Sequence, residues 1–233
     1  MKLYGAGSLD DIKKCTELGV VGILTNPQGF EQYYKGEMTL EEITQAIVNA
    51  TDLPVFIQIH GQTADALVEK ARKLNSIAPK QVGFKLISDE KGFQAIRRLQ
   101  KEGINCIATA LFSVSQAAVA ACVGAFGICP FVSRAREFGI DASELLLSIR
   151  EGYDRLATAP EIVVVSLKSV ADVDLALASG ADAVAMRYPL LQQMMQHPLS
   201  TKAELLFAKN WANVKGEDVG YLRHALAAEG VSE

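Results

Sequence analysis

The sequence predicts a (β/α)8 barrel, in which eight parallel strands alternate with helices and close into a cylinder. The first observation is the length, because 233 residues match α/β barrels that fold as a single domain. The second is the composition, 49% hydrophobic and 7% aromatic, which favours a parallel sheet covered by helices. The third is the alternation of short apolar runs with helical patterns along most of the chain.

The predicted strands are short runs rich in β-branched residues, as expected for strands that are buried on both faces. They lie at residues 2–4, 20–25, 54–59, 82–87, 105–111, 125–131, 161–167 and 181–187.

Helix signals occupy the segments between these runs. Two pairs have the spacing of a capping box, Ser8 with Asp11 and Thr39 with Glu42, and Asp89 and Ser169 stand where an N-cap is expected. Glycines that end helices precede four of the strands, at Gly19, Gly103, Gly124 and Gly180. Eight strand–helix units in a chain of this length close best as a barrel.

The chain continues beyond the eighth unit with more helical sequence than one barrel helix requires. These segments lie at residues 190–197, 202–213 and 218–228. We therefore expect a barrel over residues 1–197 and a helical extension over residues 198–233. Phe207 and Trp211 are four apart on one helical face, so the extension is expected to pack on the barrel or on a neighbouring subunit.

Charge and composition exclude several classes of function. The 23 basic and 27 acidic residues give a net charge of −4, and no Lys/Arg-rich run indicates a nucleic-acid partner. No apolar run reaches the ~18 residues of a membrane span, and the N-terminus lacks a signal-peptide pattern. The four cysteines have no CxxC spacing, so we expect buried, reduced thiols in a cytoplasmic protein, with no metal site and no cofactor.

Polar residues gather at the predicted carboxyl ends of the strands, where barrels of this kind place their active sites. They are Thr25, Asn26, Gln58, His60, Lys85, Thr109, Ser133, Arg134, Ser166, Lys168 and Arg187, with Phe131 at the end of the sixth strand.

Lys85 is the most informative of these residues, because it stands inside the apolar run 82–87. If Phe84 and Leu86 pack on the helices, alternation turns Lys85 into the barrel. Burial of an ammonium group lowers its pKa and frees the amine to form a Schiff base with a carbonyl substrate. The alternatives are a lysine that extends to solvent from a strand end, or one paired with a buried carboxylate.

The chain resembles the small transaldolase-like family that includes fructose-6-phosphate aldolase, over essentially its whole length. The resemblance rests on the order and spacing of seven short motifs. These are Leu3-Tyr4, Thr25-Asn26-Pro27, Val82-Gly83-Phe84-Lys85, Thr109-Ala110, Pro130-Phe131-Val132-Ser133-Arg134, Ser166-Leu167-Lys168 and Gln192-Gln193-Met194.

The resemblance implies a role for each matched residue. Lys85 would form the Schiff base, and Gln58 and Thr109 would hold the water that shuttles protons. Asn26 would bind substrate hydroxyls, with Thr25 and Phe131 also at the substrate, and Arg134 and Ser166 would bind the distal phosphate. Lys168 and Arg187 would add positive potential or be solvated strand-end charges. Arg134 could instead pair with Glu137 or Asp141, and Ser166 could be a satisfied hydroxyl.

The sequence departs from the family where an aspartate is expected at the end of the first strand, because Ala6 stands there. Asp10 and Asp11 belong to the first turn of the following helix and are not obvious substitutes. His60, two residues beyond Gln58, should face the same cavity, and histidine is a common general base, so it is the candidate replacement. A histidine that only meets water at the barrel rim is the alternative.

The expected function is a Schiff-base transaldolase or aldolase that moves a three-carbon dihydroxyacetone unit from a ketose phosphate such as fructose 6-phosphate. Phe131 favours transfer, since the aldolases of the family have tyrosine there, whereas Gln58 matches the aldolases. The alternatives are a degenerate member that binds a phosphorylated or sulfonated sugar with altered or lost catalysis, and an isomerase or epimerase. The resemblance also implies a homo-oligomer, a pentamer or a decamer.

Overall fold

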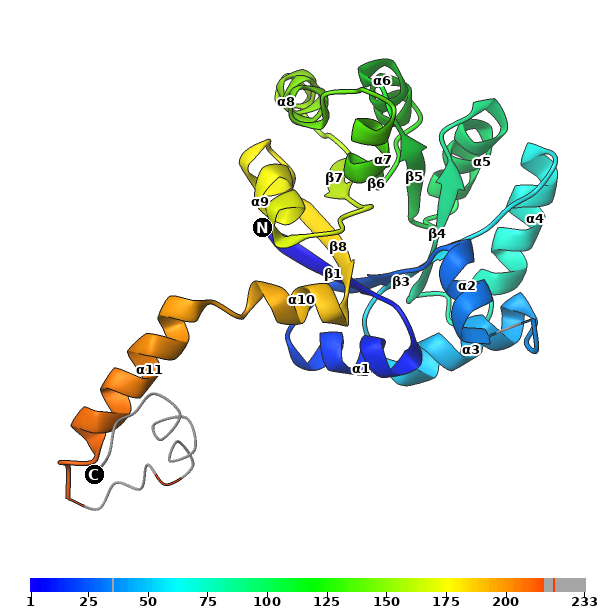
Figure 1. The fold of residues 1–233 in the computed structure, drawn as a ribbon. Helices are drawn as coiled ribbons and strands as arrows, with labels where there is room; N and C mark the ends of the chain where they lie inside the picture. Colours follow the sequence, from blue (N-terminus) through cyan, green and yellow to red (C-terminus); the bar gives the residue numbers. More distant parts are fainter. Residues whose placement is uncertain (35, 216–219, 221–233) are drawn as a thin grey trace. The chain divides into compact units, whose positions relative to one another are not determined.

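The computed structural model describes residues 1–34, 36–215 and 220. Eight parallel strands form a closed barrel in the order of the sequence, from β1 to β8, with β8 paired to β1. Figure 1 shows helices α1 to α9 arranged around this barrel. The predicted (β/α)8 architecture is therefore confirmed, followed by further helix at the C-terminal end.

All eight predicted strands are present, most of them shorter than the apolar runs that indicated them. Their bounds are β1 Lys2–Ala6, β2 Gly22–Leu24, β3 Val55–Gln58, β4 Val82–Ile87, β5 Cys106–Leu111, β6 Gly127–Pro130, β7 Glu161–Val164 and β8 Ala183–Arg187.

The helices begin where the capping residues predicted. Both capping boxes form, at Ser8 and Thr39, and the Asp89 and Ser169 side chains cap their helices. The helices are α1 Leu9–Glu17, α2 Pro27–Tyr34, α3 Leu40–Ala50, α4 Ala64–Asn75, α5 Glu90–Lys101, α6 Val114–Cys122, α7 Val132–Glu137, α8 Ala142–Tyr153, α9 Val170–Ala178, α10 Tyr188–Met194 and α11 Pro198–Trp211.

Two connections each contain an additional helix at the carboxyl end of the barrel, α2 after β2 and α7 after β6. Helix α2 begins because Pro27 suits the first helical position and the Asn26 side chain accepts a hydrogen bond from the Gly29 amide at 2.7 Å. These helices bring residues from outside the strands to the mouth of the barrel.

The chain divides into two units, Met1–Leu191 and Gln192–Glu233. The first contains the barrel. The second contains α11, on which Phe207 and Trp211 are about half exposed. The helix expected at residues 218–228 lies outside the described residues. No helix in the described part of the chain is long and apolar enough to cross a membrane.

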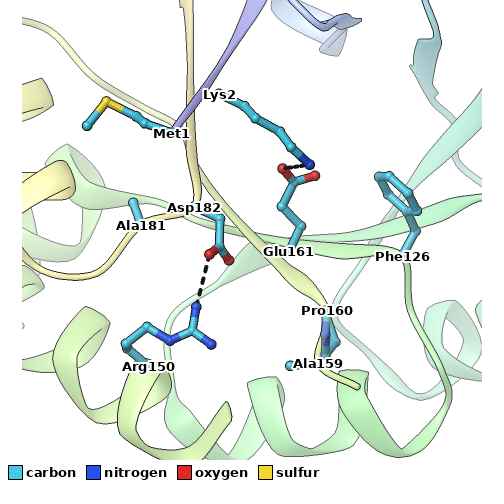
Figure 2. Close-up of a pocket in the computed structure, with 9 residues that line it drawn as sticks. All are labelled: Met1, Lys2, Phe126, Arg150, Ala159, Pro160, Glu161, Ala181 and Asp182. Atoms are coloured by element: carbon cyan, nitrogen blue, oxygen red, sulfur yellow. Dashed lines mark hydrogen bonds and ion pairs between the residues drawn. The ribbon is translucent and has the colours of Figure 1, made fainter. Parts of the chain in front are cut away.

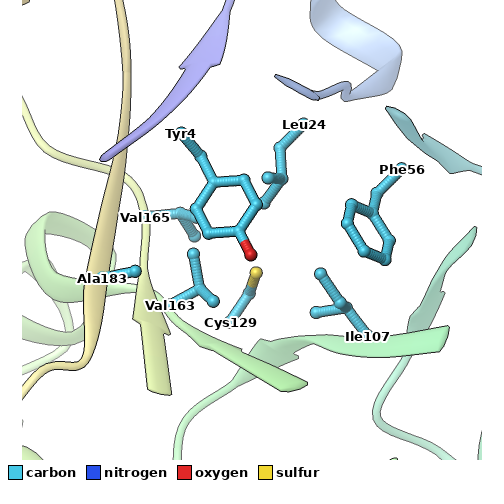
Figure 3. Close-up of a cluster of buried hydrophobic side chains, with 8 residues drawn as sticks. All are labelled: Tyr4, Leu24, Phe56, Ile107, Cys129, Val163, Val165 and Ala183. Atoms are coloured by element: carbon cyan, nitrogen blue, oxygen red, sulfur yellow. The ribbon is translucent and has the colours of Figure 1, made fainter. Parts of the chain in front are cut away.

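The interior of the barrel is filled by side chains from many strands, drawn in Figure 3. This interior cluster consists of Tyr4, Leu24, Phe56, Ile107, Cys129, Val163, Val165 and Ala183. Because side chains alternate along a strand, residues two positions further along point to the same side. The cluster therefore identifies which residues face the barrel mouth.

The cysteines are free thiols, as predicted, and Cys15, Cys106 and Cys129 are buried. Cys122 differs from the prediction because it lies exposed at the end of α6.

Candidate active site

Lys85 lies inside the barrel, as the alternation of β4 predicted. The residue is only 3% exposed, and its Nζ donates a hydrogen bond to the backbone oxygen of Thr25 at 3.2 Å. Among the described residues, no carboxylate lies within ion-pair distance of the amine. Burial lowers the pKa of Lys85, and charge on the Cys129 thiol acts in the opposite direction. The site thus favours a neutral, nucleophilic amine.

A glycine makes room beneath the lysine. Gly83 is two residues before Lys85 on the same face of β4, and a Cβ there would lie 2.6 Å from the Asn105 oxygen and 2.9 Å from the Phe56 ring. Only glycine lets the Phe56 ring pack this closely against β4. The Phe56 ring therefore packs in the barrel interior against Gly83, one pleat before Lys85.

Gln58 and Thr109 lie on the strands that flank β4. Gln58 is the register partner of Lys85, and Thr109 on β5 is the partner of Ile87. Thr109 is fully buried, and its Oγ1 makes no well-formed hydrogen bond among the described residues, although it interacts with the Cys129 thiol and lowers the pKa of that group. Each follows a member of the interior cluster by two positions, so both face the barrel interior with Lys85.

Thr25 is engaged in structural hydrogen bonds. Its hydroxyl donates a hydrogen bond to the backbone oxygen of Phe56 at 3.2 Å and accepts one from the backbone N–H of Gln58 at 3.0 Å. Its backbone oxygen holds Lys85. Thr25 therefore connects β2, β3 and the Lys85 amine, and its hydroxyl proton is used within the protein.

Asn26 and His60 lie at the exposed rim. The Asn26 side chain caps α2 by accepting a hydrogen bond at its Oδ1. The NH2 group of the same side chain takes no part in this cap. The His60 side chain is exposed, and its backbone oxygen accepts a hydrogen bond from Lys70 Nζ at 2.6 Å. Ala6 ends β1 beside them with no carboxylate to offer.

Arg134 and Phe131 form a pair at the end of β6. The Arg134 guanidinium lies 5.4 Å from the centre of the Phe131 ring, a cation–π arrangement. The acidic partners considered for Arg134 are used elsewhere, since Glu137 pairs with Lys168 at 2.6 Å and Asp141 caps α8. Arg134 is therefore available for an anion, whereas the charge of Lys168 is matched by Glu137.

Ser166 has a left-handed backbone, with φ at 61°, which is uncommon for a residue with a side chain. Its oxygen accepts a hydrogen bond from the Ser133 amide at 3.1 Å, which ties the end of β7 to α7. Ala110, next to Thr109, is the other such residue in the described chain. Strained backbone of this kind clusters at functional sites.

Asp172 holds the loop that carries Ser166 and Lys168. Its buried carboxylate accepts hydrogen bonds from the Lys168 amide at 2.8 Å and the Ser133 hydroxyl at 3.3 Å, and it pairs with Arg136. Burial alone would raise the pKa of Asp172, but these hydrogen bonds and the arginine lower it below its usual range. The carboxylate thus anchors the loop that carries Ser166 and Lys168.

Arg187 reaches across from β8 to α2. Its Nη1 donates to the Tyr33 hydroxyl at 3.0 Å and to Gln32 Oε1 at 3.4 Å. The sequence offered no signal for this contact, which joins residues 154 positions apart. Cys129, also missed, could have been found from alternation, since it precedes Phe131 by two positions on β6 and lies in the interior cluster. Burial raises the pKa of Cys129 to about 11.

A cavity of about 530 Å³ lies at the opposite, amino end of the strands (Figure 2). Its charged groups neutralise one another, because Lys2 pairs with Glu161 and Arg150 with Asp182, each at 3.0 Å. Tyr4 donates to the other Glu161 oxygen at 2.9 Å, which closes the base of the barrel. Catalytic sites of barrels form at the other end, so we place no chemistry here. No group of three or more His, Cys, Asp or Glu side chains suited to a metal occurs in the described residues.

Comparison with known proteins shows the family to which the chain belongs. The profile of the Transaldolase/Fructose-6-phosphate aldolase family matches residues 6–232. A protein of Streptococcus pyogenes serotype M5 (strain Manfredo), named "Probable transaldolase", is 35% identical over 205 residues, which cover 88% of this chain and 94% of that protein. The same values hold for a protein of that name from S. pyogenes serotype M49 (strain NZ131).

A solved structure shares the barrel fold at low sequence identity. Thiamine phosphate pyrophosphorylase from Pyrococcus furiosus superposes with a TM-score of 0.54 at 17% identity, over 79% of this chain and 84% of that one. This likeness concerns the fold alone. The family profile and the streptococcal relatives show that the chain belongs to the transaldolase/fructose-6-phosphate aldolase family.

Proposed function

We propose that this protein is a Schiff-base transaldolase or aldolase that takes a dihydroxyacetone unit from a ketose phosphate such as fructose 6-phosphate, with Lys85 as the nucleophile. The observation that carries the proposal is the Lys85 amine, which is buried, held by one backbone oxygen and unpaired with any described carboxylate. A structural lysine in such a place would be expected to have an acidic partner.

The reaction begins when Lys85 Nζ attacks the ketose carbonyl carbon, and the carbonyl oxygen takes a proton to give a carbinolamine. Loss of water then leaves a protonated imine on Lys85. Gln58 and Thr109 flank the amine, and we assign them the water that carries these protons. The Thr109 hydroxyl supports this role, because a buried hydroxyl without a well-formed hydrogen bond favours bound water or substrate.

The protonated imine accepts the electron pair of the C3–C4 bond as that bond breaks. A base takes the proton of the C4 hydroxyl, and a three-carbon aldehyde leaves. The enamine on Lys85 then attacks an acceptor aldehyde, or takes a proton, and water releases the product and the free amine. His60 is our candidate for the base, since Ala6 has no group to accept the proton.

Arg134 and Ser166 are assigned to the distal phosphate. A guanidinium can bind two phosphate oxygens at once, and Arg134 has no described carboxylate partner to compete. Phe131 stands beside Arg134 without a hydroxyl that could hold hydrolytic water, so we favour transfer to an acceptor aldehyde over hydrolytic release.

The proposal is tested with a panel of ketose phosphate donors and aldehyde acceptors. Wild type should exchange the three-carbon unit between donor and acceptor, and Lys85→Met should lose this activity. Lys101→Met, at the exposed end of α5, is the control for removal of a lysine. Equal exchange by wild type and Lys85→Met would contradict the proposal.

The second candidate is a member of the family that binds a phosphorylated or sulfonated sugar with lost or altered catalysis. Ala6 is the observation that favours it, because the usual strand-end carboxylate is missing. Ala6→Asp distinguishes the two. If wild type binds the donor without turnover and Ala6→Asp gains turnover, the second candidate is correct.

A further inference from the structure

Arg187 lies beside the position of the missing carboxylate. It is the last residue of β8, and its register partner on β1 is Ala6. Ala183 belongs to the interior cluster, with Ala185 packed against it, so alternation places Arg187 on the side of the barrel mouth. Arg187 therefore brings a positive charge to this part of the barrel mouth, next to the small side chain of Ala6.

The Arg187 guanidinium is oriented without being neutralised. Its hydrogen-bond partners, the Tyr33 hydroxyl and the Gln32 side-chain oxygen, are both uncharged. No carboxylate in the described part of the chain lies within ion-pair distance of it. Lys168 at the same end of the barrel differs, since Glu137 matches its charge.

Much of the guanidinium's capacity to donate hydrogen bonds is unused by these partners. Both bonds leave from Nη1, whereas an arginine carries five N–H donors in a fixed planar fork. The Tyr33 oxygen accepts from Arg187, so its own proton can be donated to a further acceptor. A fork of N–H donors with a hydroxyl beside it is suited to a phosphate or a carboxylate.

This group is separate from the distal phosphate site assigned above. Arg134 follows β6, whereas Arg187 ends β8, with β7 between them. Lys85 lies on β4, across the barrel from β8. Lys85 is buried in the interior, whereas Arg187 is exposed at the carboxyl end of β8, so a donor bound to Lys85 would extend toward Arg187 at the barrel mouth.

We propose that Arg187, positioned by Tyr33 and Gln32, binds an anionic group carried by the three-carbon donor itself, in the space next to Ala6. This inference rests on the proposed Schiff-base function and narrows its substrate class to donors with a phosphate or carboxylate next to the carbonyl-bearing carbons. A donor of this kind is held at both ends, by Lys85 at its carbonyl and by Arg187 at its charge.

Three small donors that differ only at one end test the proposal. They are dihydroxyacetone, dihydroxyacetone phosphate and hydroxypyruvate, which carry a hydroxymethyl, a phosphate and a carboxylate group. Each is incubated with the protein over a range of concentrations and trapped with borohydride. Mass spectrometry then gives the concentration at which half of Lys85 carries the reduced adduct.

We expect at least one anionic donor to reach half-trapping at a concentration about tenfold lower than dihydroxyacetone. Arg187→Met should abolish this advantage and leave dihydroxyacetone unchanged, and Arg187→Lys should keep only part of it, because an ammonium lacks the fork. Arg155→Met is the control, since it removes one exposed positive charge that pairs with Glu151 at the end of α8. That variant should behave as wild type.

Whichever anionic donor is favoured identifies phosphate or carboxylate as the group bound. Equal half-trapping concentrations for all three donors in wild type would overturn the proposal, and so would an anionic preference that survives in Arg187→Met. If dihydroxyacetone is trapped normally while the anionic donors gain nothing, the subsite fails and the Schiff-base function stands. If no donor is trapped on Lys85, both fail.

Discussion

At the scale of single residues, the burial of Lys85 favours chemistry and opposes folding. The unfolded chain exposes the amine to water, whereas the folded barrel holds it 3% exposed with a lowered pKa. The folded protein therefore holds this proton less tightly than the unfolded chain does, so the burial of Lys85 lowers the free energy of unfolding at neutral pH. Lys85 is thus a source of instability that an apolar side chain would remove.

We therefore expect Lys85→Met to raise the free energy of unfolding while it abolishes turnover. The gain should be largest near neutral pH and shrink as the pH rises toward about 10.4, the ordinary lysine value, because the unfolded wild type then also loses its proton. Denaturant unfolding of both proteins between pH 6 and pH 10.5 measures this. A loss of stability at all pH values would show that Lys85 has a stabilising partner.

His60 lies exposed at the rim beyond Gln58 and is our candidate for the base that takes the C4 hydroxyl proton. If it is the base, His60→Ala should lower turnover by about 10²–10⁴-fold. Borohydride trapping of donor on Lys85 should remain close to wild type, because that step does not need the C4 proton to leave. Unchanged turnover in His60→Ala would exclude this role.

At the scale of elements, Thr25 connects strands β2 and β3 to the lysine on β4. Thr25→Val keeps the shape of the side chain but removes the hydroxyl that bonds to both the backbone N–H of Gln58 and the backbone oxygen of Phe56. We expect a loss of about 1–3 kcal/mol in stability and slower trapping on Lys85, with Thr25→Ser close to wild type.

Thr44→Val provides the matched control for this change. Thr44 is also buried, but its hydroxyl bonds within α3 to the Leu40 oxygen. The Thr44→Val variant should be less stable than wild type, but the rate at which Lys85 is trapped per folded molecule should not change. Equal trapping rates in Thr25→Val and wild type would show that Thr25 does not position the amine.

The loop after β7 depends on the Asp172 carboxylate. Because the folded pKa of Asp172 is lowered, its stabilising contribution is present above the ordinary aspartate value of about 3.9 and is lost as the pH falls through the folded value. Asp172→Asn should thus be less stable than wild type near neutral pH, and the difference should narrow in strong acid. Exposed Asp174→Asn, on the same helix, is the control and should unfold like wild type.

The elements also show how far sequence patterns reach. Short apolar runs rich in β-branched residues located all eight strands, because strands buried on both faces have this local signature. Ser8, Thr39, Asp89 and Ser169 located four helix starts, since caps bond within three residues. The sequence patterns did not predict helices α2 and α7. Each is short, and each lies in a segment where the local patterns predict a loop between a strand and the next helix.

The candidate site was predictable only in part for the same reason. Lys85, Gln58 and Thr109 followed from their strand positions, and alternation placed them on the barrel interior. The Arg187–Tyr33 contact, the Thr25 bridge and the Asp172 anchor join residues from different elements. Such contacts depend on how the barrel closes, and a local pattern carries no signal for them.

At the scale of the whole molecule, the C-terminal helix α11 has exposed apolar side chains, with Phe207 and Trp211 each more than half exposed. We propose that they bury against another copy of the chain, as the expected pentamer or decamer requires. Light scattering after size-exclusion chromatography should show a smaller particle for the double variant Phe207→Ser, Trp211→Ser. An unchanged mass would assign assembly to another surface.

The central claim concerns the whole barrel, since its closure is what places one lysine out of water among groups from different strands. Borohydride reduction with fructose 6-phosphate, followed by peptide mapping, tests this claim most directly. The account predicts a reduced three-carbon or six-carbon adduct on Lys85, with Lys168 and the other lysines unmodified, and no adduct in Lys85→Met. An adduct on a different lysine, or none on a protein that binds the donor, would contradict it.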